Sequence, residues 1–248
     1  MKLVVLGSGG YHPNEQRHTA CYFLPEVGVV LDCGTGAFRL EKFLPRDRLT
    51  ILLSHGHLDH VAGLTYLLGF QARGLLGAVD VYGLPEVVVG VREHLFSVVL
   101  FPVLPQIDWR PVGFGEVLTI SGGVSVRVLE AEHRGATANF RLDCFGRSLA
   151  YLTDTTAAGS LAHRPVLENV DILLHECYFP DGFEEMAQQT GHTCLGQAIQ
   201  VAQELKARRL VLIHINPLVD SPEKLGFKPS ASYEPPTILA EDWAEIQF

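Results

Sequence analysis

The sequence His55-Gly56-His57-Leu58-Asp59-His60 places three imidazoles and one carboxylate within six residues. It directly follows the apolar run of residues 49–53, which has the character of a buried strand. Neutral imidazole and carboxylate are ligands for zinc and similar divalent metals. In an extended loop His55 and His57 point the same way and can share one ion. Asp59 and His60 stand where the chain turns into the next helix and can face a second ion. The stretch therefore predicts a metal site with room for two ions.

Three further residues of ligand type stand at or just beyond the ends of apolar runs. They are His133 after residues 124–129, Asp154 after residues 148–152, and His214 after residues 210–213. Strand ends in layered α/β folds are where sites are commonly built. We therefore expect these three side chains to complete the metal site.

Taken together, these residues resemble the metallo-β-lactamase superfamily, whose pattern is H-x-H-x-D-H followed by a lone His, a lone Asp and a final His. The resemblance runs from about residue 2 to residue 218. It implies an α/β fold, a four-layer αββα sandwich of two mixed β-sheets flanked by helices. It also implies one metal on His55, His57 and His133, a second on Asp59, His60 and His214, and Asp154 as a bridge between them.

Asp32, in Leu31-Asp32-Cys33-Gly34, matches the early Asp of the superfamily. That residue usually supports the metal loop through hydrogen bonds to its ligands. The alternative is a plain turn residue at the end of a strand.

Bulk properties favour a single compact domain over residues 1–248. No Gly/Ser-rich or Pro-rich linker divides the chain, and the candidate ligands span residues 55–214. A hydrophobic content of 47% fits a core-rich protein rather than a disordered one. No stretch approaches a membrane span, and the first apolar run is too short for a secretory signal. The five cysteines are odd in number and form no C-x-x-C pair, which indicates reduced thiols in a cytoplasmic protein.

The periodicity predicts alternating strands and helices. Strands are expected at residues 2–6, 20–24, 28–32, 79–82, 171–174 and 210–213, and helices at residues 38–44, 61–70, 86–95, 195–206 and, as a closing helix, 234–248. Residues 96–111 mix aromatics with prolines, which suits a pocket wall, a lid, a subunit contact or core packing. Gly7-Ser8-Gly9-Gly10 lacks the third glycine of a dinucleotide-binding loop and is interpreted as a glycine-rich turn.

Two later elements resemble the ribonuclease Z branch of the superfamily. His175-Glu176-Cys177-Tyr178 is similar to its H-E-A-T element, and Gly191-His192-Thr193-Cys194 to its G-H-S-T element. The resemblance implies that Glu176 and His192 assist proton transfer at the leaving oxygen, so the catalytic assignments are Asp59, His192 and Glu176. A carboxylate beside an imidazole favours the protonated donor near neutral pH. The alternatives are a salt-bridged carboxylate at a strand end and a histidine at a helix N-terminus.

The chain departs from that branch between its third and fourth ligand motifs. Ribonuclease Z carries a long arm there that clamps tRNA, whereas only residues 134–153 separate His133 from Asp154. A net charge of −9 also opposes long-range attraction of a polyanion. The interpretation is therefore a cytoplasmic binuclear metal-dependent hydrolase of a small or cyclic phosphodiester. It would use a metal-bridging hydroxide and two divalent ions, preferably zinc, with manganese or iron as alternatives.

Other functions remain open at this stage. They are a tRNA 3′-end endonuclease, a carbon-centre hydrolase of lactones or thioesters, and a non-catalytic metal-binding module. The expected partner is a small phosphodiester; RNA is not favoured, no membrane is involved, and a homodimer is an open expectation.

Overall fold

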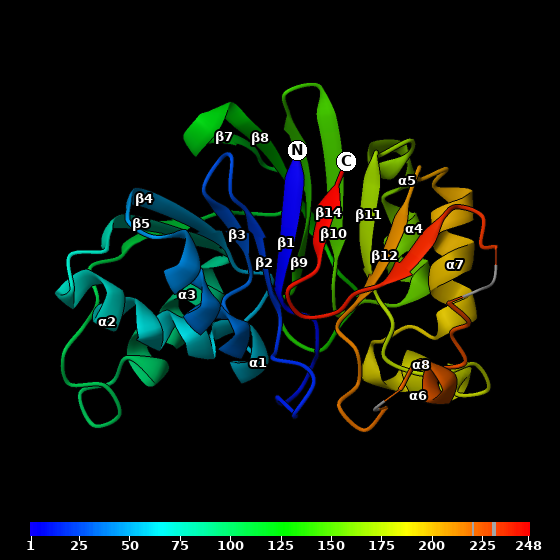
Figure 1. Ribbon diagram of the computed structural model, residues 1–248, viewed down its shortest axis with the longest axis horizontal. Helices are drawn as coiled ribbons and strands as arrows, with labels where there is room; N and C mark the ends of the chain where they lie inside the picture. The colour runs from blue at the N-terminus through cyan, green and yellow to red at the C-terminus, as the bar shows by residue number, and fades with distance from the viewer. Residues whose placement is uncertain (220, 230–231) are drawn as a thin grey trace.

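Two mixed β-sheets lie face to face, with the helices on their outer sides (Figure 1). The computed structural model describes residues 1–219, 221–229 and 232–248. Within these ranges each sheet has seven strands. The predicted four-layer αββα sandwich is confirmed. No helix in the described ranges is long and apolar enough to cross a membrane.

The first sheet is built mainly from the N-terminal half of the chain. Its order is β14 (Glu245–Gln247), β1 (Lys2–Gly7), β2 (Cys21–Leu24), β3 (Val29–Leu31), β4 (Arg46–Leu52), β5 (Leu76–Gly83) and β6 (Asp108–Pro111). Strands β3 to β6 run parallel and the remaining pairs are antiparallel. The helical segments of this half are η1 (Thr35–Phe43), α1 (Leu58–Val61), η2 (Ala62–Tyr66), α2 (Leu67–Ala72), α3 (Pro85–Gly90) and the π-helical turn η3 (Val91–Leu95).

The second sheet mirrors this arrangement in the C-terminal half. Its order is β13 (Thr237–Leu239), β12 (Leu210–Ile213), β11 (Ile172–Glu176), β10 (Arg147–Leu152), β9 (Ala138–Cys144), β8 (Val124–Glu130) and β7 (Val117–Ile120). Strands β10 to β13 run parallel. The helical segments are η4 (Ser121–Gly123), α4 (Ala157–Ala162), α5 (Arg164–Leu167), α6 (Glu184–Thr190), α7 (Leu195–Glu204) and α8 (Pro222–Leu225).

The central strands of the second sheet are apolar on both faces, as β10 shows. Leu149 and Tyr151 belong to the core between the sheets, whereas Ala150 and Leu152 belong to a second core with helix α7. Successive side chains of a strand point to opposite faces, so a strand covered on both sides must be apolar throughout. This explains the continuous apolar runs that precede the candidate ligands.

A tight hairpin joins β9 to β10. Only Phe145 and Gly146 separate the strands, with φ of 51° and 71°, and Cys144 pairs with Arg147. Two consecutive residues with positive φ are typical of the type I′ turn that suits the twist of a hairpin. The interval between His133 and Asp154 is therefore a hairpin without an arm, as the sequence predicted.

One prediction of local structure is met only in part and another is wrong. All residues of the expected helix at 61–70 are helical, but they are divided among α1, the 3₁₀ segment η2 and α2. The expected closing helix at residues 234–248 is instead strands β13 and β14 joined by turns. Ile246 faces the core while its neighbours are exposed, and β14 pairs with the otherwise open edge of β1, so sheet hydrogen bonds outweigh helix propensity there.

Candidate metal centre

Strand ends from both sheets meet at one edge of the sandwich. The loop after β4 supplies His55, His57, Asp59 and His60, and the chain just beyond β8, β10 and β12 supplies His133, Asp154 and His214. All seven predicted ligands fall into groups whose ligand atoms lie within 4.8 Å of one another. The structure therefore brings together residues that are up to about two thirds of the chain apart.

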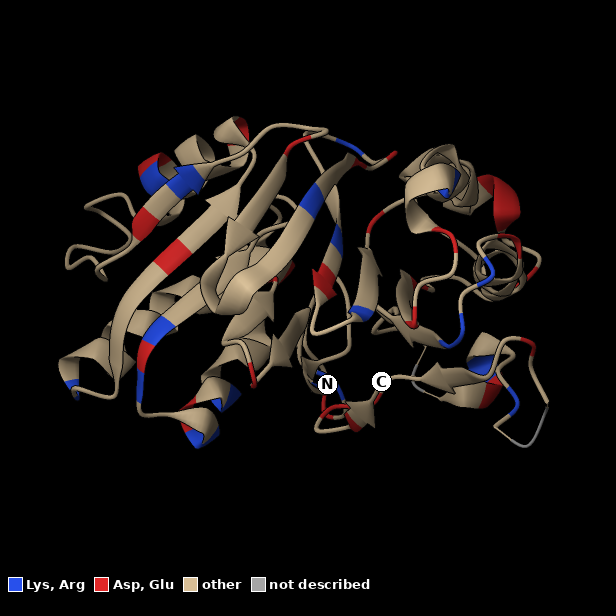
Figure 2. Cartoon of the chain, turned by 90° about the horizontal axis from the view of Figure 1, so that it is seen from above, with Lys and Arg blue, Asp and Glu red and all other residues tan. Residues whose placement is uncertain are grey.

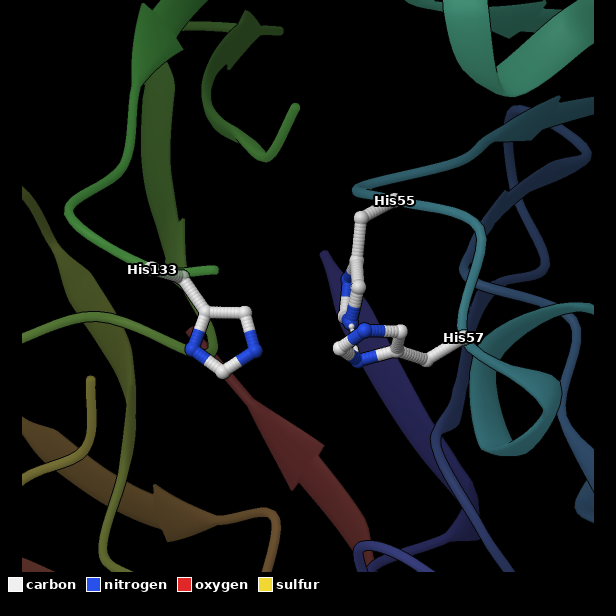
Figure 3. Close-up of side chains that lie close together, drawn as sticks. All are labelled: His55, His57 and His133. Carbon is white, nitrogen blue, oxygen red and sulfur yellow. Dashed lines mark hydrogen bonds between the residues drawn. The ribbon is translucent and has the colours of Figure 1, made fainter. Parts of the chain in front are cut away.

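His55, His57 and His133 form the first group (Figure 3). His55 and His57 come from one loop and their rings converge, with His55 Nε2 2.9 Å from His57 Nδ1, while His133 faces them from a separate segment. His133 Nε2 is buried without a hydrogen-bond partner in the described part of the chain. A buried polar nitrogen normally has a partner, and a bound ion would supply it. Burial lowers the pKa of His57, and burial with His60 lowers that of His55, which favours the neutral imidazole that a metal ion requires.

Asp59, His60 and His214 form the second group. His60 Nε2 lies 3.1 Å from His214 Nε2 and 3.3 Å from Asp59 Oδ2. Asp154 spans both groups, since its Oδ2 is 3.2 Å from His60 Nε2 and its Oδ1 is 3.7 Å from His133 Nε2. The donor set of imidazole and carboxylate therefore fits two divalent ions, with Asp154 able to reach both.

Three residues of the centre have left-handed backbone conformations. Asp32, Asp154 and His214 have φ of 55°, 45° and 52°, and each directly follows or nearly follows a strand. Such conformations cost free energy for residues other than glycine and concentrate at functional sites. At each of these residues the backbone turns at the end of the strand, and the side chain then points to the edge of the sandwich where the candidate ligands lie.

Hydrogen bonds from neighbouring residues orient the ligands. Asp32, which is fully buried, lies with its Oδ2 2.7 Å from His60 Nδ1, as expected for support of the metal loop. The backbone N–H of Tyr11 donates to Asp59 Oδ2 at 2.6 Å. His133 Nδ1 lies 3.0 Å from the carbonyl oxygen of Gly191. Such contacts fix which ring nitrogen is left for an ion.

Glu176 and His192 form a hydrogen-bonded pair beside the ligand groups. Both oxygens of the fully buried Glu176 lie 3.1 Å from His192 Nδ1. Burial lowers the pKa of His192, but the adjacent Glu176 outweighs it and raises that pKa to about 9. Tyr178 stacks on the His192 ring at 4.4 Å between centroids and 13° between planes. The imidazole is therefore held by its edge and by one face.

A cavity of about 550 Å³ opens onto these groups. Its lining comprises Tyr11, His57, Leu58, Asp59, His133, Arg134, Asp154, Tyr178, Thr190, His192 and His214. Arg134 is the single lysine or arginine among the described residues that line it. Candidate metal ligands, His192 and aromatic side chains thus face one space large enough for a small organic ligand.

Sequence reasoning missed the residues that support the centre from outside the ligand motifs. Ser54, Tyr151 and the backbone of Tyr11 carry no local motif, because their roles arise only from contacts made by the folded chain. Tyr178 stands in the element that resembles H-E-A-T, but that resemblance assigned it no role, and its stacking on His192 is seen only in the structure. His175 lies outside the cavity lining and is buried against Ser160, with Nε2 2.9 Å from its Oγ. Cys177 and Cys194 are buried and also absent from that lining.

Comparisons with known proteins agree with the fold. Residues 28–215 match the model of the beta-lactamase superfamily domain. Ribonuclease Z of Pyrobaculum calidifontis is 29% identical, over 87% of this chain and 87% of that protein. The crystal structure of the metallo-beta-lactamase fold protein YhfI from Bacillus subtilis superposes with a TM-score of 0.83 at 20% identity, covering 99% and 98% of the two chains. A diphosphatase from the PhnP family superposes with a TM-score of 0.75 at 20% identity, covering 100% and 97%.

Proposed function

This chain belongs to the beta-lactamase superfamily, and within it we propose that the chain is a two-metal hydrolase of a small phosphodiester. The carrying observation is His192, which is hydrogen-bonded to the buried Glu176 and lines the same cavity as members of both ligand groups. A protonated imidazole beside the reacting centre suits a substrate whose leaving oxygen is a poor leaving group. The names of its relatives, ribonuclease Z and diphosphatase, both denote hydrolysis at phosphorus.

We propose two zinc ions, the first held by His55, His57 and His133, the second by Asp59, His60 and His214, with Asp154 shared. Imidazole-rich sets favour zinc over magnesium or calcium, and manganese or iron suits the same donors. When bound, such ions lower the pKa of water and neutralise charge that develops on phosphoryl oxygens.

Residues of the chain itself donate the proton, position the imidazole and orient the attacking water. His192 Nδ1–H donates a hydrogen bond to Glu176, so Nε2 is the atom that protonates the departing oxygen. Glu176 is itself fixed by the backbone N–H of Thr155 at 2.7 Å, and Tyr178 keeps the imidazole plane from turning. Asp59, which lines the cavity, can accept a hydrogen bond from the attacking water and orient it.

The size and charge of the site favour a small or cyclic diester over RNA. The cavity of about 550 Å³ matches a small organic ligand. The β9–β10 connection is a two-residue turn, so no arm extends the binding surface there. In the view of Figure 2 the lysine and arginine segments of the described ribbon are interspersed with aspartate and glutamate segments. RNA affinity comes largely from phosphate contacts by lysine and arginine, and Arg134 is the single such residue among the described residues that line the cavity.

The experiment is a comparison of four substrates with the zinc-loaded and manganese-loaded chain. They are bis-p-nitrophenyl phosphate, a 2′,3′-cyclic nucleotide, p-nitrophenyl acetate and an unprocessed tRNA. We expect turnover of both diesters and no discrete tRNA cut. A clean cut at the tRNA 3′ end would establish the endonuclease alternative, and turnover of the acetate alone would establish carbon-centre hydrolysis.

We also propose a homodimer that forms through an apolar surface next to the metal loop. Its exposed side chains are Leu58, Val89, Val98, Val99, Leu100, Val103 and Leu104, which are 47% to 87% exposed. At about 60–120 Å² for a fully buried valine or leucine, they offer about 300–550 Å² of apolar area. A standard interface buries about 800 Å² per partner, of which roughly 450 Å² is apolar area. Residues 95–107 carry no charge, so two copies meet without repulsion there.

Sedimentation of wild type and of Val99→Glu tests the dimer. Phe145→Glu, at an apolar residue 72% exposed on the β9–β10 turn, is the matched control. We expect Val99→Glu to be monomeric and Phe145→Glu to remain dimeric. A monomeric wild type, or binding of this surface to lipid vesicles instead, would overturn the proposal.

Residues 1–248 are proposed to act as one domain, because both sheets contribute ligands and share a core. The five cysteines are all free and buried, which is the state favoured in a reducing compartment, so we retain the cytoplasm as the proposed location.

A further inference from the structure

Tyr151 connects the two sheets directly beneath the metal centre. It lies in β10 of the second sheet and is fully buried, and its hydroxyl donates to Asp32 Oδ2 at 2.6 Å. Asp32 immediately follows β3 of the first sheet. The chain continues from Tyr151 through two residues to Asp154. One strand therefore delivers both the shared ligand and a hydrogen bond to the opposite half of the site.

Asp32 collects donors from the metal loop as well. The backbone N–H and the hydroxyl of Ser54 each lie 2.7 Å from its oxygens, and His60 Nδ1 also lies at 2.7 Å. A carboxylate accepts hydrogen bonds and donates none, so every one of these partners must donate. His60 therefore carries a proton on Nδ1, and Nε2 is the nitrogen left for an ion.

The same reasoning extends to a ligand of the other group. The one hydroxyl proton of Ser54 is directed to Asp32, so Ser54 Oγ must accept from His55 Nδ1, which lies 2.9 Å away. His55 then has its lone pair on Nε2, the atom that converges with His57. If the hydroxyl proton turned to His55 instead, the imidazole proton would move to Nε2 and block that ligand.

We propose that Tyr151 is a positioning residue whose hydrogen bond fixes Asp32 and thereby sets the ring nitrogens that His55 and His60 offer to metal. The Tyr151 hydroxyl donates to Asp32 Oδ2, the same oxygen that accepts from the Ser54 hydroxyl and from His60 Nδ1. Loss of this donor frees the carboxylate to turn, which loosens one ligand in each group at once. This inference rests on the metal centre of the proposed function, but it also predicts a property of the metal-free chain.

Tyr151→Phe removes only the hydroxyl, and Tyr22→Phe is its matched control. Tyr22 is equally buried and its ring lies 5.5 Å from that of Tyr151. Its hydroxyl is bonded to no side chain in the described part of the chain and faces the backbone of His214, so the control removes a hydroxyl beside the centre that does not touch Asp32. We expect zinc affinity, measured by competition with a chelator, to fall about tenfold in Tyr151→Phe. It should stay within twofold of wild type in Tyr22→Phe, and circular dichroism should show both variants folded.

A double-mutant cycle separates action through Asp32 from a general effect on packing. Asp32→Asn should weaken zinc binding about 10-fold to 100-fold, and adding Tyr151→Phe to it should change the affinity less than twofold. A further tenfold loss in the Asp32→Asn background, or wild-type affinity in Tyr151→Phe alone, would overturn the inference.

Nitrogen NMR of the metal-free chain gives a readout that is independent of metal binding. Wild-type His55 should carry its proton on Nδ1, whereas Tyr151→Phe should show a mixture of tautomers. Identical His55 spectra in the two chains would refute the role of Tyr151. Failure of the wild-type chain to bind any metal would refute the proposed function instead.

Discussion

Replacing Gly10 by alanine should displace His214 and remove one metal from the centre. A Cβ at residue 10 would lie 2.4 Å from His214 Cε1 and 2.5 Å from its Nε2. Carbon atoms in contact prefer about 3.5 Å or more, so one of the two must retreat by about 1 Å. The Gly10 N–H is bonded to the carbonyl oxygen of Ile215 at 3.0 Å, which ties the two backbones together. The imidazole ring is therefore the part that must move.

A shift of about 1 Å is large for a metal ligand, because ligand distances are held to about 0.2 Å. Misplacement of this size typically costs about 100-fold in rate. We expect Gly10→Ala to retain about one metal per chain by elemental analysis and to hydrolyse bis-p-nitrophenyl phosphate about 100-fold more slowly. The control is Gly69→Ala, in helix α2, where an added Cβ meets no atom within 4 Å. Wild-type metal content and turnover within twofold in Gly10→Ala would refute the steric argument.

Three further predictions follow from the same geometry. Asp154→Ala should bind at most one metal per chain, because Asp154 lies within 4 Å of ligand nitrogens in both groups; two metals by elemental analysis would contradict its shared role. His192→Ala should slow hydrolysis of a diester with an alkyl leaving group about 100-fold, but that of an activated aryl diester less than 10-fold; equal losses would remove its role as proton donor. Zinc at about 100 times its Kd should raise the Tm of the stripped chain by about 5–10 °C, and an unchanged Tm in calorimetry would argue against binding to the folded state.

The sequence carried enough information to predict the fold class and the set of residues that gathers at the site. Residues 55–60 and the apolar runs before His133, Asp154 and His214 follow local rules, namely ligand chemistry and strand burial on both faces. The absence of an arm followed from the short interval between His133 and Asp154, which the structure fills with the β9–β10 hairpin. These features are readable because each depends on a few neighbouring residues.

The remaining features depend on contacts between distant segments. Strand β14 forms because β1 leaves an edge open, and residues 245–247 alone do not show this. Tyr151 lies in an apolar run, where a tyrosine is indistinguishable from core packing until Asp32 is found opposite it. Tyr178 and the backbone of Tyr11 reach the centre in the same way. The pattern of neighbouring residues cannot reveal these contacts, because the two residues of each pair come together only when the chain folds.

The most direct test of the account is a zinc titration of the stripped chain, with hydrolysis of bis-p-nitrophenyl phosphate and of p-nitrophenyl acetate followed in parallel. We predict that the stripped chain is inactive and that diester turnover rises until two ions per chain are bound, without a matching rise for the acetate. Diester turnover that is independent of metal, or that is complete at one ion per chain, would contradict a two-metal phosphodiesterase.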